Sequence, residues 1–238
     1  MKKLLIILLV GVLIIFAGSY HIIAFSYDRF EEAEQKTALS SYYQYNDIIY
    51  TSASDTNSQA FKDLIPMVEE FFTLVPQDTM NRFKGEGWKI IISSEKPSYI
   101  LRLQNQVQYD IGGNTEHNMR LIYLYLNDNL PKYLLSDFIH EFAHYEDWEK
   151  GLVANSAEFQ KIMDDNIGYV PKDQFQDAAY HLSTSREYFA CCYKDYFLYG
   201  DYLQANAPAV YRYISSVVYD GDSNIEAFYK RVWNYLRE

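Results

Sequence analysis

Cysteine and clustered positive charge are both scarce in this sequence of 238 residues. The two cysteines, Cys191 and Cys192, are adjacent, and neighbouring side chains on a helix point about 100° apart. They are therefore poorly placed to bridge each other, and the chain has no disulfide framework. The formal net charge is −11, and no basic cluster offers the contacts that nucleic-acid phosphates require. These absences argue against a disulfide-stapled fold and against a nucleic-acid partner.

Charge is also missing from residues 4–27, which follow two lysines at the N-terminus. As a helix this run would be about 36 Å long, enough to span a bilayer, with the lysines in the cytoplasm and the rest outside. Ala17 and Ser19 also have the spacing that signal peptidase needs, so a cleaved signal peptide is the alternative. No cysteine follows the run closely, which argues against a lipoprotein. Both readings predict an extracellular protein, either secreted or anchored to the cell membrane.

Aromatic residues are plentiful, with 24 Tyr and 14 Phe, enough for a substantial core. Residues 28–60 are polar and are interpreted as a linker. We expect the folded domain to begin near Phe61, where apolar residues start to recur at helical spacing. The predicted organisation is therefore a signal anchor or signal peptide over 1–27, a polar linker over 28–60, and a folded domain over 61–238.

The pattern within the folded domain predicts a small sheet first and a helical half later. Residues 87–94 and 119–127 are short apolar runs of the kind that form buried strands. A long helix is expected from Pro131 to just before Gly151. Later helices are expected to open with capping boxes, at Asn155 and Glu158 and at Thr184 and Glu187. This order indicates an α+β fold class.

The motif HEFAH, residues 140–144, lies within that long helix. On a helix the side chains of His140 and His144 lie about 5–6 Å apart, one above the other, so both imidazoles can bind one tetrahedral zinc ion. Glu141 turns to the neighbouring side, where it can take a proton from a water that attacks a carbonyl. Histidine and glutamate are also ordinary helix residues, so a merely polar helix face is the alternative. The surrounding amphipathic helix favours a zinc hydrolase.

Two histidines do not complete a catalytic zinc site, and the residues alone leave the third protein ligand open. A metzincin would have a glycine and a histidine at the positions of Asp147 and Lys150, which excludes that class. Glu187, in the first turn of a later helix, is a candidate, but it could serve only as a capping-box residue. His181 is possible on its chemistry.

Four segments carry a resemblance to a known family. In order and spacing they resemble the catalytic domain of the anthrax lethal factor family, and they look still more like its small secreted relatives, the Pro-Pro endopeptidases. The resemblance covers roughly residues 60–218. The segments are HEFAHYEDW (140–148), NSAEFQKIM (155–163), YHLSTSREYFA (180–190) and NAPAVYRYI (206–214).

This resemblance implies a zincin-like metalloprotease domain with one Zn²⁺ per chain. It implies that Glu187, rather than His181, joins His140 and His144 as the third metal ligand. It also implies that Tyr180 donates a hydrogen bond to the oxyanion while Glu141 acts as the base. A phenol suits this role because it donates without changing its own charge.

The segment GGNT is similar to a Gly-Gly-Ser-Thr loop that covers the substrate in Pro-Pro endopeptidases, so Gly112, Gly113 and Asn114 are predicted to bind substrate. Cys191 stands where family members have a glutamate one turn after the ligand; it could replace that carboxylate beside the metal or pack as a small apolar residue. Arg186 stands where Pro-Pro endopeptidases have a substrate-positioning glutamate, and no tryptophan precedes GGNT. These departures put the Pro-Pro specificity in doubt.

The sequence thus predicts an exported zinc metalloendopeptidase that hydrolyses peptide bonds of extracellular or surface proteins, with proline near the cut site as one option. The alternative is a noncatalytic zincin-like binding module that keeps the shape after its site has decayed. The expected partner is a protein or peptide substrate, with the membrane as a second partner if the N-terminal segment is uncleaved. The oligomeric state stays open.

Overall fold

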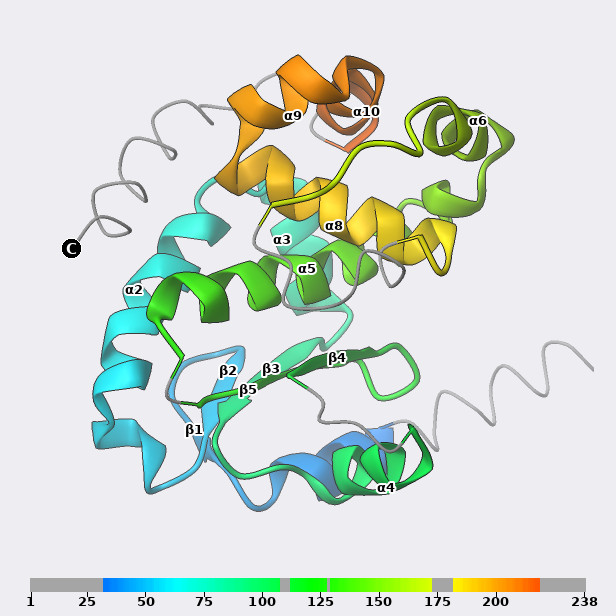
Figure 1. Cartoon of the computed structure of the whole chain (residues 1–238). Helices are drawn as coiled ribbons and strands as arrows, with labels where there is room; N and C mark the ends of the chain where they lie inside the picture. Colours follow the sequence, from blue (N-terminus) through cyan, green and yellow to red (C-terminus); the bar gives the residue numbers. More distant parts are fainter. Residues whose placement is uncertain (1–31, 108–111, 128, 173–181, 219–238) are drawn as a thin grey trace, which may run out of the picture.

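The computed structural model describes residues 32–107, 112–127, 129–172 and 182–218. A five-stranded sheet lies between two helical layers (Figure 1), and its strands run in the order β1-β2-β3-β5-β4. The strands are β1 (Tyr43–Gln44), β2 (Ile49–Thr51), β3 (Lys89–Ser93), β4 (Gly113–Glu116) and β5 (Leu121–Tyr125). The helices are α2 (Gln59–Phe72), α3 (Gln77–Gly85), α4 (Ser98–Val107), α5 (Pro131–Glu149), α6 (Ala157–Asp165), α8 (Ser185–Leu198), α9 (Gly200–Asn206) and α10 (Pro208–Tyr213). Another helix covers residues 32–39, and single turns occupy η1 (Asp55–Asn57), η2 (Val153–Asn155) and the π-helical η3 (Ile214–Val218).

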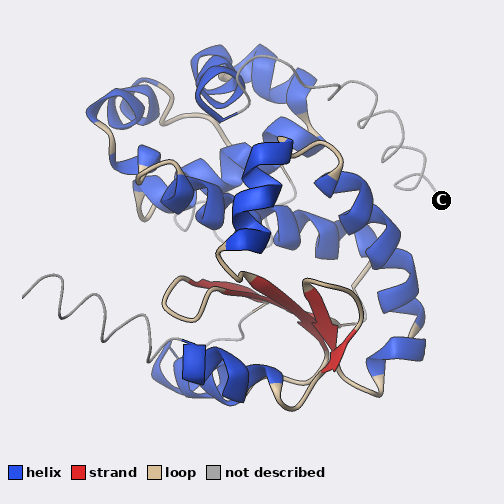
Figure 2. Cartoon of the chain, turned by 180° about the vertical axis from the view of Figure 1, so that it is seen from behind, coloured by secondary structure: helices blue, strands red, loops and turns tan. Residues whose placement is uncertain are grey.

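The centre of the sheet is buried on both faces. β3 pairs in parallel with β2 on one side and with β5 on the other, while β4 pairs antiparallel with β5. Side chains alternate along each strand. Ile90 and Ile92 therefore enter the main core between the sheet and α5, and Ile91 enters a second, smaller core between the opposite face of the sheet and α4. Figure 2 shows helices on both sides of the sheet. A strand covered on both faces is apolar throughout, which is the pattern predicted for residues 87–94.

The long helix α5 is the centre of the main core. Pro131 occupies its first turn, where a missing N–H costs nothing, and Gly151 follows its end with φ of 82°, a conformation that glycine adopts freely. Phe138 and Phe142 pack edge-to-face on Phe71 of α2, with ring centroids 5.9 and 5.3 Å away. One side of α5 faces β4 and β5 and another faces α8. α5 therefore connects the sheet half of the molecule to the helical half.

The helical half is stacked on α5. α8 crosses α5, and α6, α9 and α10 cover the side of α8 that faces away from α5 (Figure 1). Phe197 of α8 reaches the Phe71 cluster at 5.0 Å, so α2, α5 and α8 share one aromatic core.

The predicted fold class is confirmed as mixed α+β, with corrections in detail. Helices and strands alternate in the first half, so the expected order of sheet first and helices later is only approximate.

The helix α6 begins one residue later than the predicted capping box: the hydroxyl of Ser156, not Asn155, accepts from the N–H of Phe159. Asn155 instead ends the preceding turn. The GGNT segment was expected to be a loop, and from Gly113 onward it is strand β4.

The expected polar linker over 28–60 is wrong in its second half. Ile48 and Ile49 are buried in the main core, and the N–H of Ile90 donates to the carbonyl of Ile48. Residues 43–51 thus contribute two strands to the sheet, and the folded unit begins before Phe61.

None of the helices within the described ranges combines the length and the apolar character that crossing a membrane requires. The predicted signal anchor or signal peptide, 1–27, lies outside these ranges.

Candidate active site

The histidines of the HEFAH motif lie on one side of α5 near its middle. Their ring centroids are 5.0 Å apart, the separation expected one turn apart on a helix. Both side chains are mostly buried, with exposed fractions of 17% for His140 and 12% for His144. Burial lowers the pKa of His144 to about 3, so its imidazole is neutral at physiological pH. The neutral form is the one that binds a metal.

Glu187 reaches these histidines from the first turn of α8. The hydroxyl of Thr184 accepts a hydrogen bond from the N–H of Glu187 at 3.1 Å, so the predicted cap is present and fixes where α8 begins. The carboxylate of Glu187 lies against both imidazoles: Oε2 is 3.2 Å from His140 Nε2, and Oε1 is 3.5 Å from His144 Nε2. The backbone N–H of Glu187 thus takes part in the cap while its carboxylate faces the histidines, which favours the ligand role over the capping-box role that the sequence left as the alternative.

These three residues lie close enough together to be candidate ligands of one metal ion. They are the cluster among the described residues that could hold a metal ion, with one ligand atom from each within 4.8 Å of the others. Two ligands at about 2.0–2.1 Å from a tetrahedral ion lie about 3.3–3.4 Å apart. The observed nitrogen–oxygen separations of 3.2 and 3.5 Å lie close to that value. Two imidazoles and one carboxylate also leave a fourth coordination position open, as catalytic zinc sites do.

Glu141 lies under strand β4. The hydroxyl of Thr115 is 2.8 Å from Glu141 Oε2 and 2.7 Å from the Glu141 carbonyl oxygen, so one side chain fixes both the carboxylate and the helix backbone. A Cβ built on Gly113 would lie 2.7 Å from Glu141 Cγ, so only glycine leaves room for this carboxylate. Burial raises the pKa of Glu141 to about 7, with Glu187 and Asp137 adding to the rise. A group with a pKa near neutrality both takes and releases a proton readily.

Two neighbours complete the surroundings of His140. Cys191 Sγ lies 3.7 Å from His140 Nδ1, the ring nitrogen that faces away from Glu187. Cys191 therefore contacts a candidate ligand, His140, in the place predicted from its position one turn after Glu187, and it is also buried. Asp137, one turn before His140, was missed by the sequence analysis. Burial raises its pKa to about 6, with His140 and Lys194 acting in the opposite direction.

The predicted substrate-binding residues lie at the start of β4. Gly113 and Thr115 face Glu141, so Asn114 between them faces the other side of the strand. The side-chain oxygen of Asn114 is buried and has no hydrogen-bond partner among the described residues. Gly112 contributes its carbonyl, which accepts from the N–H of Tyr125. Tyr180 and His181 lie outside the described residues.

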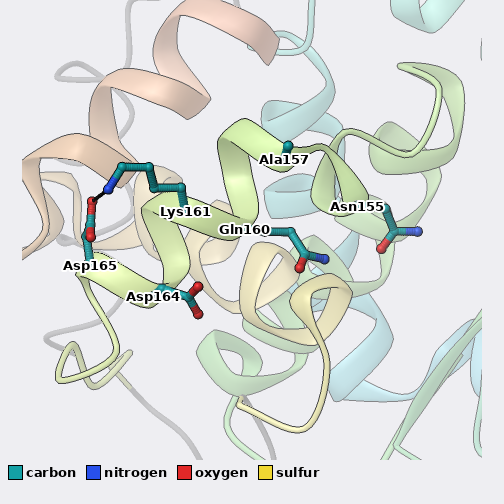
Figure 3. A pocket seen from close by; sticks show the side chains of 6 residues that line it. All are labelled: Asn155, Ala157, Gln160, Lys161, Asp164 and Asp165. Atoms are coloured by element: carbon teal, nitrogen blue, oxygen red, sulfur yellow. Dashed lines mark hydrogen bonds and ion pairs between the residues drawn. The ribbon is translucent and has the colours of Figure 1, made fainter.

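A surface hollow on α6 and η2 is separate from this constellation (Figure 3). Its walls are solvated polar side chains, including the exposed pair Lys161 and Asp165 at 2.7 Å, and none of the candidate ligands lines it. The lining residues are Asn155, Ala157, Gln160, Lys161, Asp164 and Asp165.

The fold and the site define a mixed α+β domain with a His-His-Glu candidate metal centre next to a buried glutamate. A sequence model of one family, described as anthrax toxin lethal factor, N- and C-terminal domain, matches residues 99–217, which is half of the chain. The chain belongs to this family, which is a family of zinc-dependent metalloproteases. The match contains β4, α5 and the start of α8, the three elements that form the site. No curated protein matches the chain.

Proposed function

We propose that this protein is a zinc-dependent endopeptidase with a zincin-like catalytic domain. The observation that supports it best is the convergence of His140, His144 and Glu187 at the separations of a tetrahedral site, with Glu141 held beside them. In this proposal the three residues would hold one Zn²⁺. When bound, the ion would supply a Lewis acid for the attacking water and the scissile carbonyl.

The residues of the chain have separate tasks in this mechanism. Glu141 takes the proton of the attacking water and passes it to the leaving amine, and its raised pKa suits both transfers. Thr115 holds the carboxylate of Glu141 in one orientation. Tyr180 is proposed to donate a hydrogen bond to the developing oxyanion, the role that the family resemblance gives it.

The position of β4 favours an extended peptide as substrate. β4 ends the sheet among the described strands, and it passes directly over Glu141. The outer edge of a terminal strand offers backbone N–H and C=O groups that can pair with an added strand. A peptide aligned on β4 would place its backbone, rather than a particular side chain, beside the base. A preference for proline at the cut site is retained as part of the proposal.

Export is also proposed, from the uncharged run at residues 4–27. Fractionation of cells tests it: the protein should appear in the membrane, or in the medium with a new N-terminus near residue 20–27. Recovery in the cytosol contradicts both versions.

Glu141→Gln tests the catalytic proposal. Glutamine keeps the size of the side chain next to Gly113 but cannot accept a proton. Zinc content should stay at one ion per chain, and cleavage of a peptide selected from a library digest should fall by about 10²–10⁴-fold. Elemental analysis and single-peptide kinetics measure the two effects.

Tyr180→Phe is the companion variant, because it removes one hydroxyl and keeps the ring. It should lower kcat by about 10²–10³-fold with a smaller change in KM. If zinc-loaded wild type cuts no peptide in the library, or if Glu141→Gln cuts as well as wild type, the noncatalytic binding module is the correct reading.

A further inference from the structure

Arg186, immediately before the candidate ligand Glu187, makes two contacts that point into the fold. Its Nε donates to Asp147 Oδ2 at 3.1 Å, and a terminal guanidinium nitrogen lies 3.1 Å from His117 Nε2. Asp147 is fully buried and also accepts from the N–H of Ala154 at 2.7 Å. A buried carboxylate needs such partners, because an unpaired charge in the interior is strongly destabilising.

His117 is held in its place by aromatic contacts. It lies just after β4, and its ring stacks on Trp148 of α5 with centroids 4.7 Å apart and planes at 22°. Trp88 packs against its edge, with centroids 5.6 Å apart. Arg186 therefore binds a ring that cannot easily move, and a carboxylate that is fixed in α5.

The three elements that Arg186 joins are the ones that build the candidate site. The turn after β4 carries His117, α5 carries Asp147, and α8 begins with Arg186 itself. Among these elements, β4 holds the carboxylate of Glu141 in position. α5 carries Glu141 itself and two candidate ligands, and α8 carries the third candidate ligand. The planar guanidinium offers several N–H donors in a fixed geometry, so it can set the relative position of two acceptors in a way that a lysine cannot.

We propose that Arg186 is a positioning residue that holds the first turn of α8 against α5 and the turn after β4, and so presents Glu187 to the metal. This inference rests on the proposed zinc site. Both of these guanidinium contacts, to Asp147 and to His117, are made within the fold. Asp147 has a second role, because its negative charge offsets a cation that would otherwise stand uncompensated next to a Zn²⁺ site.

The test is the zinc affinity of Arg186→Met, measured by competition with a chelating indicator. Residues that orient metal ligands typically cost tenfold to a hundredfold in metal affinity when they are replaced, and we expect a loss of about that size. At saturating zinc we expect kcat to fall more than KM changes, because Glu187 is then held less well while the peptide contacts are retained.

Arg82→Met is the matched control. Arg82 also pairs with a carboxylate of α5, Glu149, and is of similar exposure, but it joins α5 to α3 and not to α8, which carries the third candidate ligand. Both variants should lower the melting temperature of the zinc-free protein, Arg186→Met by more because it leaves the fully buried Asp147 without its guanidinium, and only Arg186→Met should weaken zinc binding. A purely structural role for Arg186 predicts the same zinc affinity in both variants.

Two more conservative substitutions test the positioning role of Arg186 if Arg186→Met does not fold. His117→Phe keeps the stacked ring on Trp148 and removes the acceptor for Arg186, and Arg186→Lys keeps the charge but cannot span both partners. Each should weaken zinc binding several-fold. If wild type binds zinc and every folded variant of this set binds it equally well, the positioning role is wrong while the proposed function stands. If wild type itself binds no zinc, the proposed function fails and this inference fails with it.

Discussion

Two residues of β4 determine the position of the Glu141 side chain. Thr115 fixes the carboxylate by a hydrogen bond, and Gly113 leaves the space that its Cγ and carboxylate occupy. Gly112, the residue before Gly113, is different: a Cβ built there would meet only Asp137 Oδ2, at an ordinary van der Waals distance of 3.8 Å. The two adjacent glycines therefore differ sharply in what they tolerate.

Gly113→Ala should displace the carboxylate of Glu141, because the new methyl group would lie 2.7 Å from Cγ and 2.8 Å from Oε1. We expect kcat/KM for a selected peptide to fall by at least about tenfold, since a small displacement of a catalytic group is costly. Zinc affinity should change little, and Gly112→Ala, whose methyl group would meet no atom closer than 3.8 Å, should lower kcat/KM by less. Equal activity of the two alanine variants contradicts the packing argument.

His117 gives the folded protein a specific acid sensitivity. Burial, assisted by the charge of Arg186, lowers the pKa of His117 to about 4 from an ordinary value of 6.5. Above pH 6.5 the residue is neutral in both the folded and the unfolded state, so its contribution to stability is fully present. As the pH falls from 6.5 to 4, the unfolded chain binds a proton that the folded chain refuses, and stability is lost.

The expected loss from this residue is on the order of 2 kcal/mol between pH 7 and pH 4, after allowance for its partial exposure. His117→Phe has no such proton, so its free energy of unfolding should decline less over this range. Urea unfolding of both zinc-free proteins at several pH values measures the difference. Parallel pH profiles for wild type and His117→Phe exclude this residue as a source of the sensitivity.

At the scale of elements, the sequence was informative where a pattern was long and uninformative where it was short. α5 spans five turns, and its apolar spacing, proline start and glycine end predicted it; β3 and β5 were visible as apolar runs. β1 and β2 have two and three residues, too few for a periodicity, and they lie among polar residues, so they were taken for linker. The fixed spacing of the HEFAH motif singled out His140 and His144 as candidate ligands, whereas only the resemblance to the family favoured Glu187 over His181 as the third. The pairing of Arg186 with Asp147 joins residues far apart in sequence and has no local signature.

Truncation distinguishes the two views of residues 28–60. A chain that starts at residue 32 should unfold cooperatively. A chain that starts at residue 61 lacks the strand that pairs with β3 and the buried Ile48 and Ile49, so it should be aggregated or only partly folded. Circular dichroism melting and gel filtration report both properties. Similar melting curves for the two chains restore the linker interpretation.

At the scale of the whole molecule, the three candidate ligands come from two helices that belong to different parts of the structure. α5 packs on the sheet, whereas α8 is covered by α6, α9 and α10 (Figure 1). In a chain whose described cysteines are both free, a metal at this point would be a cross-link between these parts. The binding energy of a metal that is held only by the folded state adds to the stability of that state.

Zinc should therefore raise the melting temperature of the protein. At free zinc about 100 to 1,000 times the dissociation constant, the stabilisation is about 2.7–4.1 kcal/mol, which corresponds to roughly 5–15 °C for a domain of this size. Differential scanning calorimetry with zinc and with excess chelator gives the shift. Glu187→Gln, which keeps the shape but removes the charged ligand, should show a much smaller shift; an equal shift in this variant places the stabilising zinc elsewhere.

The division of the candidate site among β4, α5 and α8 has a consequence for the order in which the site is assembled. A ribosome delivers β4 and α5 well before α8, and domains form from the N-terminal side as they emerge. A nascent chain thus holds the base and two histidines without the third ligand, and it has no finished centre with which to cut its neighbours. Under the proposed function, hydrolytic competence therefore depends on the docking of α8, the last of the three elements to be synthesised.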